Sequence, residues 1–225
     1  MISRQKDQPR PAEQFAMAAG TLIGVVGVVL QFYYMLQFPY ISKSEAVIRF
    51  FSFFTILTNI LVVLGYAVPL LTSQSAAGRY FASASARGAS MVYIVVVGAV
   101  YNLLLRQLYH PVGWAKVADL LVHDAAPLFY VFFWFAFVTK TGLRWTDAMR
   151  WLLFPLAYLV YTLARGAFVH YYPYPFLDVT TLGYVRVLMN AAGLTIVFWC
   201  LGLLVVAVAR GLTVIAPQIK EPDLA

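Results

Sequence analysis

Six apolar segments dominate this sequence, and each is long enough to cross a lipid bilayer. They lie at about residues 14–37, 46–71, 89–108, 117–139, 148–169 and 184–211. A helix rises about 1.5 Å per residue, so roughly 20 apolar residues span the hydrocarbon core of a membrane. Because the backbone groups of a chain in lipid must be satisfied within the segment itself, these segments predict transmembrane helices. We therefore expect an all-α, polytopic membrane protein built as one bundle of about six helices.

Composition agrees with this prediction. The chain is 62% hydrophobic and only 11% charged, whereas a soluble domain carries about a quarter charged residues. Most side chains must therefore face lipid or other helices. We expect a cytoplasmic N-terminal tail at residues 1–13, the transmembrane domain at 14–211 and a cytoplasmic C-terminal tail at 212–225. The first apolar segment is too long for the core of a signal peptide and is expected to be retained.

The distribution of basic residues predicts the orientation. Ten of the 16 Lys and Arg residues lie in the tails and in the second and fourth connections, and the others lie on the opposite side. Cytoplasmic loops are enriched in Lys and Arg, so both termini are predicted to be cytoplasmic. The net charge of +7 is thus explained without nucleic acid, for which no motif is present. The single cysteine and the absence of ligand spacing indicate no metal site, and no cofactor is expected.

Polar residues within the apolar segments gather toward one end of the predicted bundle. Five segments carry them near the end opposite the termini: Ser52, Thr55, Thr58 and Asn59; Asn102 and Arg106; Asp119 and His123; Tyr158, Tyr161 and Arg165; Arg186 and Asn190. Several are spaced three, four or seven residues apart and would share one helix face, including Ser52, Thr55 and Asn59. Ionisable groups at membrane depth normally face the bundle interior. This predicts a polar pocket in the outer half, closed from the cytoplasm by apolar residues.

Residues of this predicted pocket could carry out hydrolytic chemistry. His123 could act as a general base, and Asp119, one helical turn away, could fix the tautomer of its imidazole ring. A hydroxyl of Ser52, Thr55 or Thr58 could supply the nucleophile once a base takes its proton. A structural interpretation is also open, because membrane threonines often bond their own helix backbone and a carboxylate is favoured in the first helical turn.

Arg165, Arg186 or Asn59 could bind a carboxylate or an oxyanion in the same pocket. Arginines near helix ends also extend to lipid head groups without further function. The polar residues stop before the cytoplasmic half, which does not favour an open pore. The pattern alone therefore does not decide between an enzyme, a binding protein and a transporter.

The connection from His170 to Asp178 is rich in aromatic residues and prolines. Proline fixes φ and biases the preceding residue toward extended backbone, so this segment is expected to be stiff. We expect it to form a lid or wall over the pocket mouth, with Asp178 paired to Arg165, Arg186 or His170.

Three sequence motifs resemble the androgen-induced family of multi-pass membrane proteins and its bacterial relatives. They are Phe-Phe-Thr-Ile-Leu-Thr-Asn-Ile-Leu at 53–61, Leu-Leu-Val-His at 120–123 followed by Pro127, and Tyr-Pro-Tyr-Pro-Phe-Leu-Asp at 172–178. The motifs occur in the same order as in the family, and the resemblance covers about residues 15–210.

This resemblance implies an intramembrane threonine hydrolase acting on fatty acid esters of hydroxy fatty acids or similar lipid-like esters. Transferred to this sequence, the nucleophile is Thr55 and the base is His123. The chain has Thr58 where the eukaryotic pattern looks more like an acid or amide, and Asp119 where it has an amide. Whether Thr55 or Thr58 is the nucleophile, and whether Asp119 completes a triad, thus stays open. The alternative is a non-catalytic lipid- or small-molecule-binding protein, or a transporter, in the bacterial inner membrane.

Overall fold

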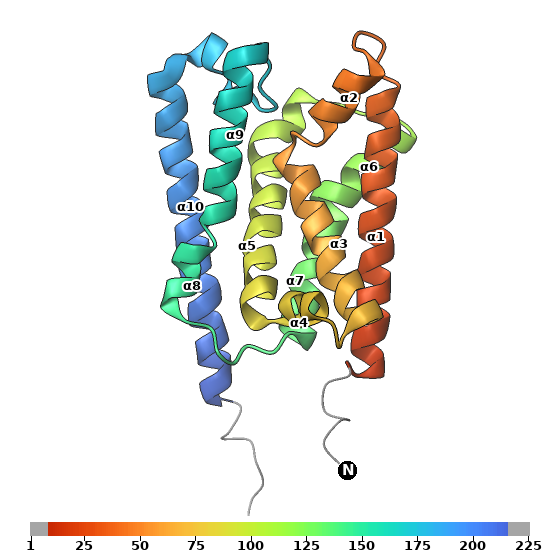
Figure 1. Cartoon of the computed structure of the whole chain (residues 1–225), viewed down its shortest axis with the longest axis vertical. Helices are drawn as coiled ribbons and strands as arrows, with labels where there is room; N and C mark the ends of the chain where they lie inside the picture. Colours follow the sequence, from red (N-terminus) through yellow and green to blue (C-terminus); the bar gives the residue numbers. More distant parts are fainter. Residues whose placement is uncertain (1–8, 216–225) are drawn as a thin grey trace, which may run out of the picture.

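The computed structural model describes residues 9–215, so most of the two predicted tails lies outside the described part of the chain. Within it, every regular element is a helix. The helices are long and apolar enough to cross a membrane six times, at Pro11–Leu36, Phe54–Thr72, Ala84–Leu108, Trp114–Phe137, Trp145–Val169 and Val179–Thr213. They run side by side in one bundle (Figure 1). The predicted all-α polytopic fold is therefore confirmed, and the chain is an integral membrane protein.

The first half of the chain forms five helices, α1 (Pro11–Leu36), α2 (Lys43–Phe50), α3 (Phe54–Thr72), α4 (Ala76–Ala82) and α5 (Ala84–Val100). The short helices α2 and α4 lie at opposite ends of the bundle (Figure 1). We call the end that holds α2 the distal end, and the end where α1 begins and α10 finishes the terminal end. Helix α4 occupies a connection that the sequence predicted as a loop.

The second half begins with a π-helical turn (Tyr101–Leu105) and a 3-10 turn (Arg106–Leu108) that complete the span of α5. It continues with α6 (Trp114–Leu120), a second π-helical turn (Leu121–Ala125), α7 (Ala126–Phe137), α8 (Trp145–Arg150), α9 (Leu153–Val169), a 3-10 turn (Pro175–Leu177) and α10 (Val179–Ile215). The last helix is interrupted at Gly183, whose φ of 72° few residues other than glycine adopt.

The prediction of one continuous helix from residue 46 to 71 is wrong. Helix α2 ends at Phe50, and α3 begins at Phe54 after a short turn. Glu45 and Arg49 give α2 a charged face, which favours a position at the membrane surface, so the chain turns before it enters the bundle. Ser52 lies in this turn and does not share a helix with Thr55.

The second π-helical turn has a cause in the sequence. Pro127 has no backbone N–H, so it cannot bond the carbonyl of His123 four residues earlier. Freed from that α-helical bond, the backbone takes a wider turn at Leu121–Ala125. Such π-helical turns occur frequently at functional sites, where they redirect side chains.

Helix α1 packs closely against α3 through small residues. An added Cβ atom would lie 2.5 Å from Tyr66 at Gly20 and 2.5 Å from Val63 at Gly24. A Cβ atom at either position would clash, so these glycines allow the side chains of α3 to lie close to α1. Such close packing is typical of membrane helices, which gain their association energy from packing rather than from water exclusion. The packing holds α3, which carries Thr55, in a fixed position beside α1.

The terminal half of the bundle is filled by aromatic rings. Tyr66 lies 4.8 Å from Phe133 and 5.4 Å from Tyr130, measured between ring centroids. This half is not wholly apolar, however. Arg87 belongs to α5 rather than to the predicted loop, is only 5% exposed, and forms an ion pair of 3.1 Å with Glu13 of α1.

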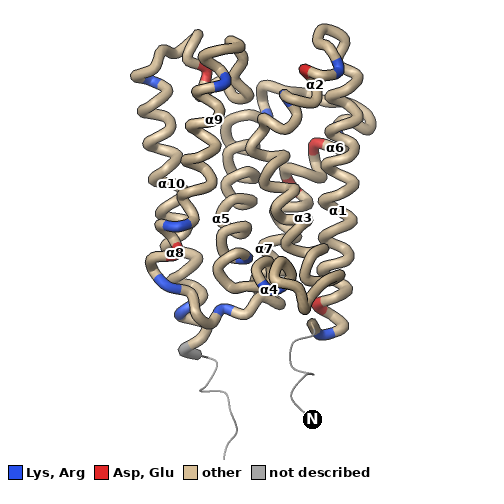
Figure 2. The backbone as a smooth tube through the Cα atoms, in the orientation of Figure 1, with Lys and Arg blue, Asp and Glu red and all other residues tan. Residues whose placement is uncertain are grey.

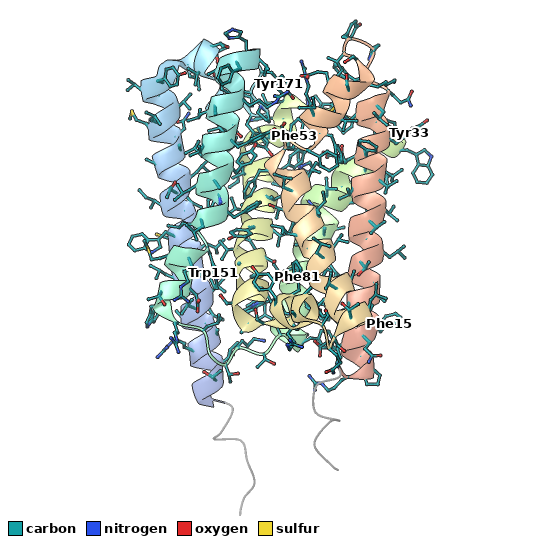
Figure 3. The ribbon with its side chains drawn as sticks, in the orientation of Figure 1. Phe15, Tyr33, Phe53, Phe81, Trp151 and Tyr171 are labelled. Atoms are coloured by element: carbon teal, nitrogen blue, oxygen red, sulfur yellow. The ribbon has the colours of Figure 1, made fainter. Side chains whose placement is uncertain are left out.

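Charged residues are concentrated near the two ends of the bundle. Figure 2 shows Lys and Arg at both ends, and few charged residues along the middle of the spans. In Figure 3, Tyr171 and Phe53 lie in the distal half, whereas Trp151, Phe81 and Phe15 lie toward the terminal end. The distal half is the one in which the sequence predicted a polar pocket.

Candidate functional site

Two cavities lie in the distal half of the bundle. The larger has a volume of about 450 Å³ and is lined mainly by α1, α2, the start of α3, the two π-helical turns and the segment 171–175. The smaller has a volume of about 80 Å³ and lies between α3, α5, α9 and α10. Four residues line both cavities: Thr55, Tyr101, Leu105 and Tyr174. The two cavities are therefore neighbours, and Thr55 lies in the wall that they share.

His123 and Asp119 line the larger cavity together. Nδ1 of His123 lies 3.0 Å from Oδ1 of Asp119 and 3.1 Å from the Asp119 backbone oxygen. Both neighbours are hydrogen-bond acceptors, so the proton of a neutral imidazole belongs on Nδ1. This leaves Nε2 with a free lone pair, as a general base requires. The spacing of four residues thus gives the contact that the sequence suggested.

Tyr101 supports both members of this pair. Its hydroxyl donates to Oδ2 of Asp119 at 2.6 Å, and its ring stacks on His123 with centroids 3.6 Å apart and an interplanar angle of 7°. The two π-helical turns bring these residues together, because Tyr101 begins one turn and His123 lies in the other. Tyr101 was not predicted from the sequence, because a tyrosine near a helix end also fits the aromatic belt of a membrane protein.

Thr55 lies in the first turn of α3, where backbone N–H groups have no partner within the helix. Its N–H donates to the hydroxyl oxygen of Tyr174 at 3.2 Å, and its Oγ1 lies 3.4 Å from the same hydroxyl. Tyr174 is buried, and burial raises the pKa of its hydroxyl. Tyr174 therefore stays neutral and remains a hydrogen-bond donor beside Thr55.

Thr58 and Asn59 have a different environment from Thr55. Thr58 is fully buried, lines neither cavity, and its hydroxyl has no hydrogen-bond partner among the described residues. Asn59 is also fully buried, and its amide donates to the backbone oxygens of Thr55 at 2.9 Å and Val122 at 3.2 Å. Asn59 therefore joins α3 to the turn that carries His123, rather than facing a bound molecule.

The segment from His170 to Asp178 forms a wall of the larger cavity, through Tyr171, Pro173, Tyr174 and Pro175. The predicted ion pair of Asp178 is wrong. Its carboxylate accepts from the backbone N–H of Thr180 at 2.9 Å and from the Thr180 hydroxyl, and Thr180 lies in the first turn of α10. The hydrogen bond from the hydroxyl lowers the pKa of Asp178. A local bond two residues away thus replaces the expected distant partner.

A charged cluster lies beside this wall. Glu45 pairs with Arg49 at 2.7 Å and with Arg165 at 3.2 Å, and the guanidinium of Arg49 stacks 3.9 Å above the ring of Tyr171. The hydrogen bond from Arg49 lowers the pKa of Glu45, which therefore stays ionised at neutral pH. Arg49 lines the larger cavity and Arg165 does not. The sequence predicted Arg165, and not Arg49, as a residue that could bind a carboxylate or an oxyanion.

Asn102 and Arg106 do not line the cavities, contrary to prediction. Both bind Asp124 instead, at 3.0 Å from the Asn102 amide and 2.7 Å from the Arg106 guanidinium. Arg186 is exposed and also lies outside both cavities. Asp124 follows His123 in the chain but does not line the cavity that His123 lines.

The remaining predicted residues are structural. The Ser52 hydroxyl lies 2.9 Å from the hydroxyl of Tyr161, and the Ser52 backbone oxygen accepts from Tyr158 at 2.9 Å. These bonds hold α9 against the turn before α3. Asn190 donates to the backbone oxygen of Phe176 at 2.9 Å and fixes the cavity wall. Of these residues only Tyr158 lines a cavity, the smaller one.

No protein family, curated protein or solved structure matches this chain in a comparison with known proteins. The resemblance to the androgen-induced family therefore rests on the three motifs and remains a prediction. The structure adds one relation between them. Thr55 of the first motif, His123 of the second and Tyr174 of the third all line the larger cavity.

Proposed function

We propose that this chain is an intramembrane hydrolase of lipid-like esters, with Thr55 as nucleophile and His123 as general base. One observation carries the proposal. A threonine hydroxyl and a histidine oriented by a carboxylate line the same cavity, and that cavity is lined mainly by apolar and aromatic side chains. Such a lining suits a lipid-like substrate, and the polar groups suit acyl transfer.

In the proposed reaction, Nε2 of His123 takes the proton of Thr55 Oγ1 as that oxygen attacks the ester carbonyl carbon. The carbonyl oxygen becomes negatively charged, and the N–H of Thr55 and the hydroxyl of Tyr174 are the neighbouring donors able to stabilise it. The tetrahedral intermediate then breaks its bond to the alcohol oxygen, which receives the proton from His123. Water repeats the sequence on the acyl-threonine, releasing the acid and restoring Thr55.

Asp119 and Tyr101 support this cycle without contacting the substrate bond. The Asp119 carboxylate stabilises the imidazolium that forms when His123 takes the proton. Tyr101 holds the carboxylate by its hydroxyl and the imidazole by its ring. At the edge of the cavity, Arg49 offers a positive charge to an anionic group, such as the carboxylate of a fatty acid ester of a hydroxy fatty acid.

The second candidate is a non-catalytic lipid-binding protein or transporter that uses the same cavity. It is favoured by the hydrogen bonding of Thr55, whose hydroxyl approaches Tyr174 rather than His123. Catalytic hydrogen bonds are often formed only with substrate bound, so this arrangement is compatible with both candidates. Binding without turnover would distinguish the second from the first.

The test is hydrolysis of lipid-like esters by the purified protein in lipid nanodiscs. Thr55→Ala and His123→Ala should each reduce turnover by about 10³-fold or more, because nucleophile and base act as a unit. Thr55→Ser should retain part of the activity, since it keeps a hydroxyl. Thr58→Val is the matched control on the same helix and should remain active. Full activity in folded Thr55→Ala protein would overturn the assignment, and saturable ester binding without hydrolysis would favour the second candidate.

We further propose that the protein lies in a bacterial inner membrane with both termini in the cytoplasm. An even number of spans brings the two ends of the described chain to the same side, and the excess of Lys and Arg favours the cytoplasm for that side. The cavities would then open in the outer half. Fusion of a periplasm-active or a cytoplasm-active reporter to the C-terminus tests this, and activity of the periplasmic reporter would reverse the orientation.

A further inference from the structure

The two cavities beside Thr55 differ in chemistry. His123, Asp119 and Arg49 line only the larger one. Residues found only in the smaller cavity are almost all apolar, and they include Leu159 of α9 and Ala191, Leu194 and Phe198 of α10. Thr55 and Tyr174 line both. An ester bound at Thr55 therefore has two different spaces available for its two arms.

The position of the base determines which arm enters which space. A general base that takes the proton of the nucleophile gives it back to the leaving alcohol, so that alcohol must lie on the side of His123. His123 lines the larger cavity and not the smaller one. The acyl chain extends from the other side of the carbonyl carbon, where the smaller apolar cavity begins.

We propose, on the basis of the proposed function, that the smaller cavity is the acyl-binding site and selects esters of medium-chain acids. The alcohol arm binds in the larger cavity, beside His123 and Arg49. Ala191, Leu194 and their neighbours on α10 then determine the length of the acid that is released. Residues of α10, which are far from Thr55 in the sequence, would thus set substrate specificity.

The volume of the smaller cavity sets the expected chain length. A water-sized group needs about 10–15 Å³ of cavity volume. The smaller cavity, at about 80 Å³, therefore holds roughly five to eight groups of methylene size beyond the carbonyl carbon. Acids of about six to nine carbons should fit. Each buried methylene contributes about fourfold to kcat/KM, so activity should rise with chain length until the cavity is full. Longer chains should then be hydrolysed more slowly.

Two variants on α10 test the assignment from opposite directions. Ala191 is buried and lines only the smaller cavity, so Ala191→Phe should fill it. Leu194 lines the same cavity and is half-buried, so Leu194→Ala should enlarge it. The neighbouring Ala192 is exposed and lines neither cavity, which makes Ala192→Phe the matched control.

The experiment measures kcat/KM in nanodiscs for 4-nitrophenyl esters with acyl chains from acetyl to hexadecanoyl. Ala191→Phe should lower the value for the octanoyl ester at least tenfold and change that of the acetyl ester less than twofold. Leu194→Ala should move the optimum to longer acids, and Ala192→Phe should leave the profile unchanged. In a second series, acetyl esters of alcohols of increasing length should respond to none of the three variants.

Several results would overturn this assignment. They are a wild-type profile indifferent to acyl length, a Leu194→Ala profile identical to wild type, or a loss confined to the alcohol series in Ala191→Phe. Leu194→Ala decides the question if Ala191→Phe fails to fold. In each of these cases, hydrolysis that still depends on Thr55 would mean that the proposed function stands and only the acyl-site assignment fails. Absence of any Thr55-dependent hydrolysis removes both proposals.

Discussion

Two buried groups of polar side chains lie near opposite ends of the bundle, and they differ in what surrounds them. At the distal end, Asp119 bonds His123 and Tyr101 beside a cavity of about 450 Å³. At the terminal end, Arg87 pairs with Glu13 and packs against Phe133, and neither partner lines either of the two cavities described above. Both groups contain ionised or ionisable residues within spans.

The comparison shows that a polar residue within a membrane span does not by itself indicate a functional site. Arg87 and Glu13 join α5 to α1, so their ion pair holds two spans together. The distal group has a donor, an acceptor and an unoccupied imidazole nitrogen next to open space, which is what proton transfer requires. Variants in the first group should therefore alter stability, and those in the second should alter catalysis.

Among the variants that test this difference between the two groups, Asp119→Asn should have the largest effect, on hydrolysis. Replacing the carboxylate that orients a catalytic histidine lowers kcat by on the order of 10²–10⁴-fold, because the wrong tautomer is favoured and the imidazolium loses its counter-charge. Glu13→Gln is the matched carboxylate-to-amide change at the terminal end and should leave kcat per folded molecule within about twofold. Equal losses in both variants would remove the distinction between the two groups.

Next in size is the effect of Arg87→Met on stability. Breaking a buried ion pair leaves Glu13 without its partner and should lower the free energy of unfolding by about 3 kcal/mol. Reversible unfolding in mixed micelles measures this change. The double variant Glu13→Gln, Arg87→Met should recover part of the loss, since no unpaired charge remains. A double variant less stable than Arg87→Met would show that the pair is not the source of the effect.

Tyr101→Phe should have a smaller effect, on catalysis alone. It removes the hydrogen bond to Asp119 but keeps the ring stacked on His123. A hydrogen bond to a charged group contributes about 1.5 kcal/mol, which corresponds to roughly a tenfold loss in kcat. KM and the unfolding free energy should change little, and Tyr101→Leu should lose more because it also removes the stacking. An increase in KM without a change in kcat would contradict a positioning role.

Thr58→Val is expected to have almost no effect, although Thr58 lies one turn from Thr55. Its hydroxyl has no partner among the described residues, and removing an unpaired buried hydroxyl is neutral or slightly stabilising. Hydrolysis should stay within about twofold of wild type, and the midpoint of thermal unfolding should not fall. A large loss of turnover would instead move the nucleophile to Thr58.

Much of the fold could be predicted from the sequence, because apolar length and the exclusion of unpaired backbone from lipid leave few alternatives. The same holds for the contact of His123 with Asp119, which a spacing of four residues places one turn apart. The predicted polar pocket is wrong in its lining, because both cavities are lined mainly by apolar and aromatic side chains. Local features were harder to predict. The break between α2 and α3 has no proline or glycine to mark it, and Arg87 was assigned to a loop because helix ends are uncertain from sequence alone.

The composition of the site was only partly predictable. Helical spacing shows which residues share a face of one helix, but not which faces of different helices meet. Tyr101 and His123 lie in π-helical turns of two different spans, and Arg49 lies on α2, which the sequence did not separate from α3. Asn102 and Arg106 were predicted to line the pocket, and they bind Asp124 instead.

The most direct test of the account is the identity of the residue that an active-site probe modifies. A fluorophosphonate reacts with an activated hydroxyl, forming a bond between phosphorus and oxygen and releasing fluoride. We expect mass spectrometry of the labelled protein to find the phosphonate on Thr55. Labelling should be lost in Thr55→Ala and in His123→Ala, and retained in Thr58→Val and Glu13→Gln. A phosphonate on another residue, or undiminished labelling of folded Thr55→Ala protein, would contradict the assignment of Thr55 as the nucleophile.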